Sequence, residues 1–293
     1  MTGGERLARD LDTKVNGELA RVGVLHRTFY RAKSEHSINE KILAKGYSRE
    51  GERLMQDLLG LRVTLYFADD IPIVCSILRS LFGKPCDETI DTPDRETFKP
   101  SRVNLVFSLP AKLRREMEFL VRGRPIDLSF EVQVRTVLAE GWHEVEHDLR
   151  YKVPEDWNEC PDLGRALNGV VATLETCDWS MLQLFDELAY RHYRANKWGS
   201  MVRHKFRMRF TSRELSSALA EELSRRPDVA KRIFRVDRGM FLRSILIHSI
   251  SIPLTLDNVV YAANGLFVKD EELRHLTPEP IRDSLDLVRP GHT

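Results

Sequence analysis

Three stretches of the chain alternate between hydrophobic and polar residues, which is the pattern of a β-strand with two different faces. They are 61–67, 103–109 and 126–136. The third has the strictest alternation, and its polar face carries Glu131, Gln133 and Arg135. Neighbours on one face lie about 7 Å apart, so an acid, an amide and a guanidinium form one row. The row fits a functional site, although an antiparallel strand with one face in water has the same pattern.

Hydrophobic residues at helical spacing predict helices between and beyond these strands. Residues 5–30 are predicted to form one helix or a pair of helices, and another helix is predicted to begin near Ser37. Single helices are predicted over 48–60, 71–82, 110–120 and 136–152, and further helical sequence continues to about 195. The apolar stripe of 136–152 includes Trp142, Val145 and Leu149, and the polar stretch 84–97 predicts a loop.

The composition changes near residue 196. Between 197 and 243 there are 13 Lys and Arg against 5 Asp and Glu. Alternation over 204–210 predicts a strand with a basic face, and Thr211 with Glu214 predicts a capping box for the next helix. We therefore expect one domain over 1–196 and a smaller, mostly helical domain over 197–293.

Charge and cysteine content narrow the class of protein. The 293 residues include 45 Lys and Arg and 44 Asp and Glu, a net charge of +1, which argues against wholesale electrostatic binding to nucleic acid or a membrane. The 4 cysteines lie far apart without CxxC spacing, which is typical of reduced thiols. The N-terminus lacks the apolar stretch of a signal peptide, and the most apolar run, 240–256, is interrupted by charge and proline. We expect a soluble, cytoplasmic protein.

Residues 143–147 match HExxH, a zinc-protease signature. Glu146 occupies a position that is normally uncharged there, and Asp148 follows the second histidine. A solvated helix face, or a helix lining some other active site, is the preferred interpretation, and a zinc peptidase is the remote alternative.

Two further clusters have the residue types that phosphate chemistry needs. Arg31, Lys33 and Lys41 surround the start of a predicted helix and could hold a polyphosphate, although such a basic cluster is also common on solvated surfaces. Asp57 and Glu131 occupy or border neighbouring predicted strands. Two carboxylates opposite several cations are what magnesium-dependent transfer from a nucleoside triphosphate requires.

Four separated motifs occur in an order that resembles the RelA/SpoT synthetase domain. They are R-x-K-x3-S-I-x2-K at 31–41, D-L-x-G-x-R at 57–62, E-V-Q-V-R-T at 131–136 and W-x-E-x-E-H at 142–147. The resemblance covers about 20–195. It implies an α+β fold, in which helices flank a mixed five-stranded sheet related to that of nucleotidyltransferases.

The resemblance also implies an activity. The family transfers the β,γ-pyrophosphate of ATP to a 3′-hydroxyl, usually of GDP or GTP, and so makes (p)ppGpp. Carried over to this chain, the resemblance assigns ATP binding to Arg31, Lys33, Lys41 and Arg62. Arg62 is also a second candidate for neutralising charge on the transferred group. Asp57 binds Mg²⁺, Glu131 shares the metal or acts as base, and Arg135 neutralises charge on the transferred group.

The acceptor-binding stretch departs from the family pattern. The family has G-Y-x-S-x-H, but Pro100 stands here in place of the tyrosine and Asn104 in place of the histidine. Proline has no π-face on which guanine could stack. The residues assigned to the acceptor are therefore Asn104, Gln133 and Phe98, which is the nearest aromatic residue.

Alternative functions follow from this departure. One keeps the donor chemistry and changes the acceptor to an adenine nucleotide or the 3′ end of tRNA, as in toxin-type relatives. Another is a non-catalytic protein that senses nucleotides. Small synthetases of the family are often homo-oligomers, and the role of 197–293 stays open.

Overall fold

The structure is a computed structural model that describes residues 3–50, 53–90 and 103–286. Contacts divide the chain into two compact units. The first unit is Met1–Glu18 with His26–Asp178, and the second unit is Leu19–Leu25 with Trp179–Thr293.

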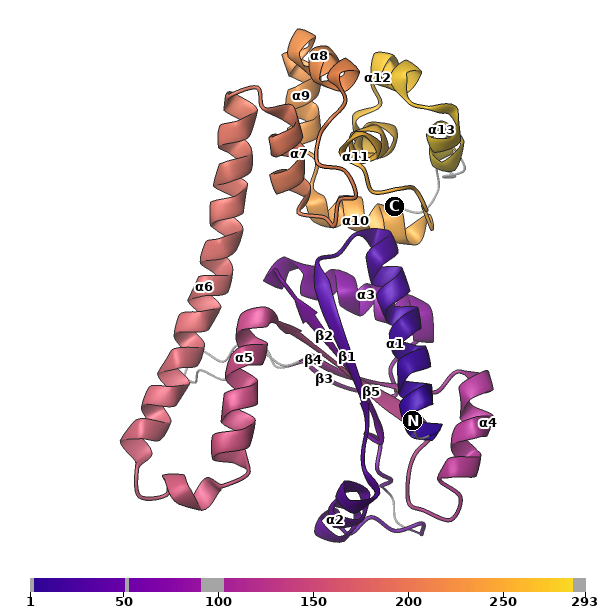
Figure 1. Cartoon of the computed structure of the whole chain (residues 1–293), viewed down its shortest axis with the longest axis vertical. Coiled ribbons are helices and arrows are strands. Elements are labelled where there is room, and N and C mark those ends of the chain that lie inside the picture. The colour runs from indigo at the N-terminus through magenta and orange to yellow at the C-terminus, as the bar shows by residue number, and fades with distance from the viewer. Residues whose placement is uncertain (1–2, 51–52, 91–102, 287–293) are drawn as a thin grey trace. The chain divides into compact units, whose positions relative to one another are not determined.

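A mixed five-stranded sheet forms the centre of the first unit (Figure 1). Its order is β1 (His26–Ala32), β2 (Leu59–Leu65), β5 (Ser129–Thr136), β4 (Val103–Ser108) and β3 (Asp87–Ile90). The central pair β2 and β5 is parallel, and the other neighbours are antiparallel. The mixed five-stranded sheet that the resemblance implied is confirmed.

Three helices cover the hydrophobic face of this sheet: α1 (Gly3–Val22), α3 (Ile71–Phe82) and α4 (Ala111–Leu120) (Figure 1). The ring of Phe82 on α3 lies 5.6 Å from that of Phe107 on β4 and 4.9 Å from that of Phe130 on β5. Both strand residues are fully buried. Burial of such rings is a main source of stability for the domain.

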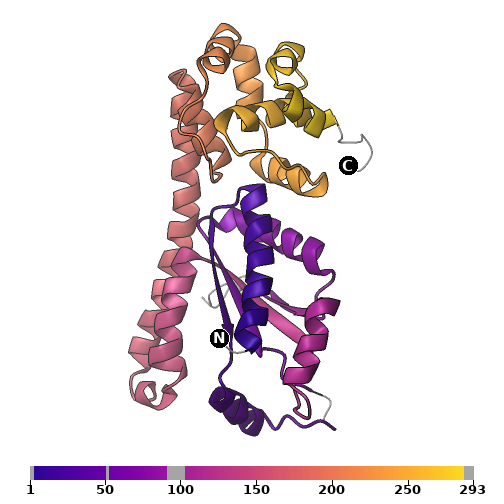
Figure 2. The same cartoon turned by 45° about the vertical axis from the view of Figure 1, so that its right-hand side comes forward.

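The opposite face of the sheet carries the polar residues, and α5 (Val137–Glu146) stands beside it (Figure 1). A π-turn (His147–Tyr151) and a 3₁₀ turn (Pro154–Trp157) lead to the long helix α6 (Pro161–Arg194). Figure 2 also shows α5 beside the first half of α6, where the Trp142 indole donates a 3.2 Å hydrogen bond to the carbonyl of Leu167. The remaining helix of this unit, α2 (Glu35–Lys45), follows β1.

The second unit is helical in its described residues. After the end of α6 it contains α7 (Trp198–Phe206), α8 (Ser217–Arg225), α9 (Pro227–Phe234), α10 (Arg238–Ile247), α11 (Leu256–Ala263) with a π-turn (Asn264–Val268), α12 (Glu271–Leu276) and α13 (Glu279–Asp286). The rings of Phe206 and Phe241 meet at 4.8 Å in its core. The mostly helical character expected for the C-terminal part is confirmed.

Residues 19–25 group with the second unit for a structural reason. The Arg21 guanidinium donates a 2.6 Å hydrogen bond to the carbonyl of Ile250, and the Arg209 amide donates one of 2.9 Å to the carbonyl of Gly23. Gly23 has a φ of +89°, and a Cβ there would lie 2.7 Å from the Met208 methyl carbon. This positive φ favours glycine, because it strains the backbone of any residue with a side chain.

Three predictions for the first unit were wrong. The segment 5–30 is a helix followed by β1 at the edge of the sheet, not one helix or a pair. The segment 48–60 is not helical over its described residues, because Met55 exchanges backbone hydrogen bonds with 125–127. The expected loop 84–97 contains β3, and the part of it after Ile90 lies outside the described residues. The helices 71–82 and 110–120 and the strand 103–109 are confirmed within a residue or two.

In the second unit, 204–210 is not a strand. Residues 204–206 end α7, and Arg207 adopts a left-handed conformation with a φ of 44°. The buried Arg238 side chain donates to the carbonyls of Phe206 and Arg207, which holds this turn in place. The next helix is capped by Ser216, not by Thr211 with Glu214. The structure divides the chain inside α6, between Asp178 and Trp179, whereas the change in charge composition lies at residue 196.

Within the described residues, no helix is both long and hydrophobic enough to cross a bilayer.

Candidate nucleotide-binding site

Strand register gathers residues from all five strands into two adjacent rows on the polar face of the sheet. The first row is Arg31, Gly60, Glu131, Val106 and Asp87. The second row is Phe29, Arg62, Gln133, Asn104 and Thr89. The predicted row on β5 therefore lies at the centre of the face, between residues that are remote in sequence.

A cleft of about 640 Å³ opens over these rows. The sheet contributes six of the predicted site residues to its wall: Arg31, Arg62, Asn104, Glu131, Gln133 and Arg135. The opposite wall comes from α5 and its continuation, with Glu140, His143, Glu144 and His147 among its residues. The HExxH helix thus lines a cleft that other motifs also form.

A second, smaller hollow of about 190 Å³ adjoins the same face. Its wall includes Lys41, Asp57 and Asp87. Glu131 and Asn104 line this hollow as well as the larger cleft. The Asn104 side-chain oxygen is buried without a hydrogen-bond partner among the described residues.

Asp57 is held by two of the predicted phosphate-binding lysines. Its Oδ2 lies 2.6 Å from Lys41 Nζ and 3.3 Å from Lys33 Nζ. Burial alone would raise the pKa of Asp57, but the hydrogen bonds and charges of Lys41 and Lys33 outweigh burial and lower this pKa below its ordinary value. The carboxylate therefore stays ionised at neutral pH.

Local structure brings Lys41 to this position. Ser34 caps the start of α2 by accepting a hydrogen bond from the Ser37 amide, and Gly46 ends the helix with a φ of 65°. The Lys33 amide continues from β1 by donating a 2.9 Å hydrogen bond to the carbonyl of Leu58, next to Asp57. The motifs at 31–41 and 57–62 thus meet at one edge of the polar face.

The residues present fit a magnesium ion. The second oxygen of Asp57, Oδ1, is buried without a hydrogen-bond partner among the described residues. One oxygen of Glu131 accepts from Gln133 Nε2 at 3.1 Å, on the wall that Asp57 shares. The described residues contain no cluster of three or more Asp, Glu, His or Cys side chains that could hold a metal by themselves. Mg²⁺ commonly takes only one or two carboxylates and completes its shell with water and phosphate oxygens.

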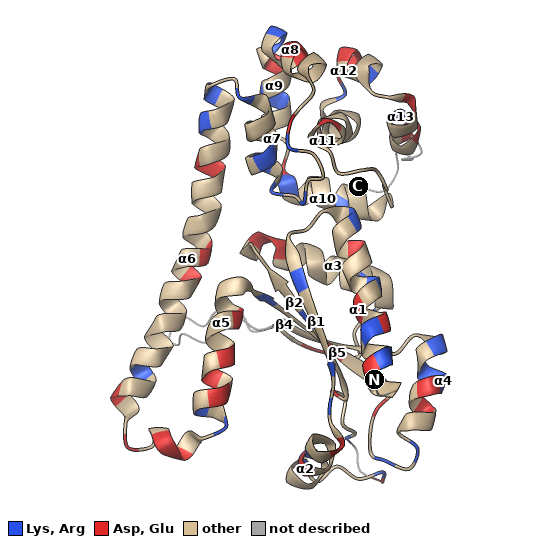
Figure 3. Ribbon diagram, in the orientation of Figure 1, with Lys and Arg blue, Asp and Glu red and all other residues tan. Residues whose placement is uncertain are grey.

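Arg62 and Arg135 point toward α5. Arg62 forms ion pairs with both Glu140 and Glu144, and Arg135 lies 3.4 Å from the other oxygen of Glu140. Acidic residues gather along α5 in Figure 3. The sequence pattern allowed the helix around 143–147 to line an active site, but it assigned no role to Glu140 or Glu144. Their spacing of one helix turn, directly after a strand rich in site residues, was the available signal.

Of the ten predicted site residues, the structure brings nine to these two adjoining hollows or to the carboxylate of Asp57, which lines the smaller one. The tenth, Phe98, lies outside the described residues, as does Pro100.

Part of the chain matches known proteins in sequence. Residues 30–156 match a family model described as "Region found in RelA / SpoT proteins". The GTP pyrophosphokinase YwaC of Bacillus subtilis (strain 168) is 26% identical over 158 residues, which cover 50% of this chain and 70% of that protein. The resemblance of this part of the chain to the RelA/SpoT family is confirmed.

Solved structures of small alarmone synthetases are also similar. Synthetase 1 from Bacillus subtilis has 24% identity and a TM-score of 0.45, covering 61% of this chain and 90% of its own. The same enzyme bound to its product pppGpp gives 21% identity and a TM-score of 0.46, covering 64% and 95% of the two chains.

Proposed function

We propose that the protein is a magnesium-dependent pyrophosphokinase that transfers the β,γ-pyrophosphate of ATP to the 3′-hydroxyl of GDP or GTP. The observation that carries the proposal is the convergence of four cations and two carboxylates on one polar sheet face, namely Arg31, Lys33, Lys41, Arg135, Asp57 and Glu131. The matching family region and the relatives' names support it.

The donor nucleotide binds through the cations. Arg31 offers a planar fork that contacts phosphate oxygens bidentately, whereas Lys33 and Lys41 act as point charges. Ion pairs with Asp57 hold both lysine ammonium groups in place. The two groups are therefore already positioned to bind the phosphates of the donor nucleotide. Asp57 and Glu131 would hold Mg²⁺, which when bound neutralises charge on the β- and γ-phosphates.

The transfer step needs a base and a neutralised leaving group. Glu131 takes the proton from the acceptor 3′-hydroxyl, and the oxygen attacks the β-phosphorus of ATP. The bond between that phosphorus and the oxygen bridging to the α-phosphate breaks, and AMP leaves with the bonding electrons. Arg135, on the same face of β5, stabilises the charge that develops on the transferred group, with Arg62 as a second donor.

Asn104 and Gln133 are adjacent in the register of β4 and β5 and lie on the cleft wall. We assign the acceptor base to them, because both side chains offer hydrogen-bond donors and acceptors to a guanine edge.

The test is a transfer assay with γ-labelled ATP and Mg²⁺, in which GDP, GTP, ADP, AMP and bulk tRNA are supplied separately. We expect label on GDP or GTP, and its loss in Glu131→Gln. The exposed Glu187→Gln, on α6, is the matched control and should keep full activity. Label on an adenine nucleotide or tRNA would keep the donor chemistry and overturn the acceptor assignment. No transfer to any acceptor would overturn the proposal and favour a nucleotide-sensing protein.

A further inference from the structure

Two carboxylates from one helix hold the same arginine in the cleft. Glu140 and Glu144 lie one turn apart on α5, and an oxygen of each pairs with the same guanidinium nitrogen of Arg62. Glu140 uses its other oxygen to reach Arg135 at 3.4 Å. One acid therefore bridges β2 and β5, whereas the other contacts β2 alone.

The two acids differ sharply in burial. The side chain of Glu140 is 12% exposed and that of its partner Arg135 is 4% exposed, whereas the side chain of Glu144 is 56% exposed. Removing one partner of a buried ion pair leaves an uncompensated buried charge, which is strongly unfavourable. An exposed pair contributes little and exchanges readily with water. Glu140 is thus fixed, and Glu144 is free to rotate away.

The charge balance gives this difference a consequence for binding. Arg62 and Arg135 are neutralised when both acids are in place, so this wall has little attraction for an anion. When Glu144 leaves, the two arginines and Glu140 keep one net positive charge, and the Arg62 Nη1 atom that Glu140 and Glu144 share regains a donor on the cleft wall. A phosphate oxygen is the natural partner for that charged donor.

We propose that Glu140 is the positioning residue that fixes Arg62 and Arg135 relative to each other, and that Glu144 is a displaceable counter-ion whose place on Arg62 is taken by a phosphate of the bound nucleotide. This inference rests on the proposed function, which supplies the nucleotide. Glu140 acts through the two arginines and does not touch the substrate.

The different roles of Glu140 and Glu144 can be tested, because substitution of Glu144 should strengthen nucleotide binding and substitution of Glu140 should slow turnover. Glu144→Gln removes a competing anion, so the Kd for Mg²⁺ and the α,β-methylene analogue of ATP should fall about two- to fivefold, which is the range an exposed pair provides. Glu140→Gln also removes a negative charge, but it loses the spacing of the two arginines, so kcat should fall at least about tenfold even where that Kd falls as well. Calorimetry of the analogue and the transfer assay measure the two effects. Glu187→Gln, which removes an exposed acid paired with Arg191, is the matched control and should change neither.

A double variant separates positioning from a general loss of structure. If Glu140 acts through Arg135, adding Glu140→Gln to Arg135→Gln should lower kcat little further, whereas independent damage would multiply. If Glu140→Gln does not fold, Glu140→Asp retains the buried counter-charge with a shorter reach and should show the same loss of kcat.

The outcomes distinguish the two proposals. If the wild-type protein binds no ATP analogue, the proposed function and this inference both fail. If it binds the analogue but Glu144→Gln binds no tighter, or if Glu140→Gln keeps wild-type kcat, only the inference is overturned.

Discussion

The two oxygens of the Asp57 carboxylate have different surroundings. Oδ2 is neutralised by Lys41 and Lys33, whereas Oδ1 is buried without a hydrogen-bond partner among the described residues. This asymmetry suits a group that is anchored on one side and is meant to bind on the other.

Asp57→Asn keeps the size of the side chain but removes its charge. We expect kcat/KM for pyrophosphate transfer to fall about 100-fold or more, because electrostatic stabilisation by a preorganised group commonly contributes that much. Steady-state kinetics measure the loss, and circular dichroism checks that the fold is kept. The exposed Asp283→Asn on α13 is the control, and equal activity of the two variants would contradict the assigned role.

Asp178 is a buried acid with an incomplete set of hydrogen bonds. Its Oδ2 accepts a 2.7 Å hydrogen bond from Thr136, which caps the start of α5, but Oδ1 has no partner among the described residues. Burial raises the pKa of Asp178, and the hydrogen bond from Thr136 offsets only part of this effect. The ionised form is therefore disfavoured in the folded protein.

Asp178→Asn should accordingly stabilise the protein by about 1 kcal/mol at neutral pH, since it removes the buried charge and keeps an acceptor for Thr136. Because the folded pKa is raised, the wild-type penalty is absent below the unfolded pKa and develops as pH rises through the folded pKa. The gain should thus shrink on acidification toward pH 4. Urea unfolding at both pH values measures it, and a less stable variant at pH 7 would refute the argument.

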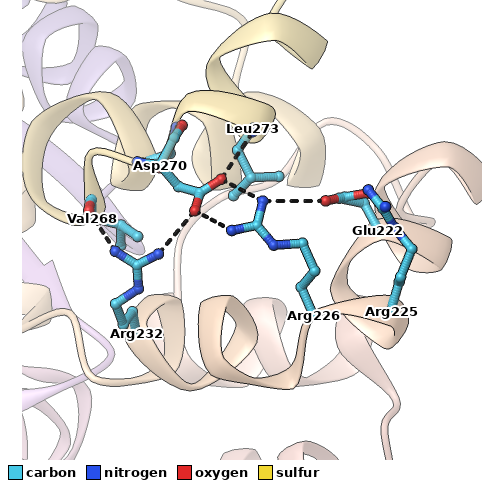
Figure 4. Close-up of polar contacts among 8 residues, drawn as sticks. Glu222, Arg225, Arg226, Arg232, Val268, Asp270 and Leu273 are labelled. Atoms are coloured by element: carbon cyan, nitrogen blue, oxygen red, sulfur yellow. Dashed lines mark hydrogen bonds and ion pairs between the residues drawn. The ribbon is translucent and has the colours of Figure 1, made fainter.

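Among the helices, α12 begins at an aspartate, Asp270, that stabilises its first turn. Asp270 caps the helix by accepting a 3.2 Å hydrogen bond from the Leu273 amide. Its carboxylate also accepts hydrogen bonds from the guanidinium groups of Arg226, between α8 and α9, and Arg232, on α9 (Figure 4). Burial would raise the pKa of Asp270, but these hydrogen bonds and charges outweigh burial and lower it.

Asp270→Asn should lower the free energy of unfolding by about 1–2 kcal/mol at pH 7, because it removes the charge that pairs with Arg226 and Arg232, whose side chains are 26% and 44% exposed. A lowered folded pKa means that this stabilisation is complete above the ordinary value near 4 and is lost as pH falls through the folded pKa. The difference between variant and wild type should therefore disappear in strong acid. Urea unfolding across that range tests this, and a constant difference would point to packing in place of charge.

Elements with a strong local pattern were predictable from the sequence. The helix 71–82 and the strands β4 and β5 each bury one regular face, so periodicity alone identifies them. The strand β1 was missed because it is an edge strand whose Phe29 and Tyr30 are exposed, so it lacks clean alternation. The segment before β2 was misassigned because long-range backbone pairing with residues near 126, which no local pattern encodes, overrides its helical spacing.

The residues of the site likewise include some that local sequence predicts and some that it does not. Arg31, Asp57 and Glu131 could be identified as candidate site residues from the sequence, because each lies in a short motif that is recognisable by itself. The roles of Glu140 and Glu144 depend on α5 folding back over β2, and Glu140 is 78 residues from its partner Arg62. Such a contact is visible only once the sheet order is known.

For the whole molecule, the two units should respond differently to ligand. The proposed site draws its described residues from the first unit alone. Nucleotide at 100 times its Kd should stabilise that unit by about 2.7 kcal/mol. Hydrogen exchange resolved by segment should therefore show protection of β2 and β5 that greatly exceeds any change in α8, α9 and α12. Equal protection of both sets of elements would show that they open together.

Glu131 and Asn104 stand on the boundary between the two hollows and belong to both. Whatever fills one hollow alters the electrostatic and steric surroundings of the other through these side chains. By thermodynamic linkage, the factor by which one ligand changes the affinity of the second must equal the factor in the reverse direction. The shared wall therefore makes the protein a candidate for cooperative or ordered binding of two substrates, and the sign of the cooperativity is set by the charge that each ligand brings to Glu131.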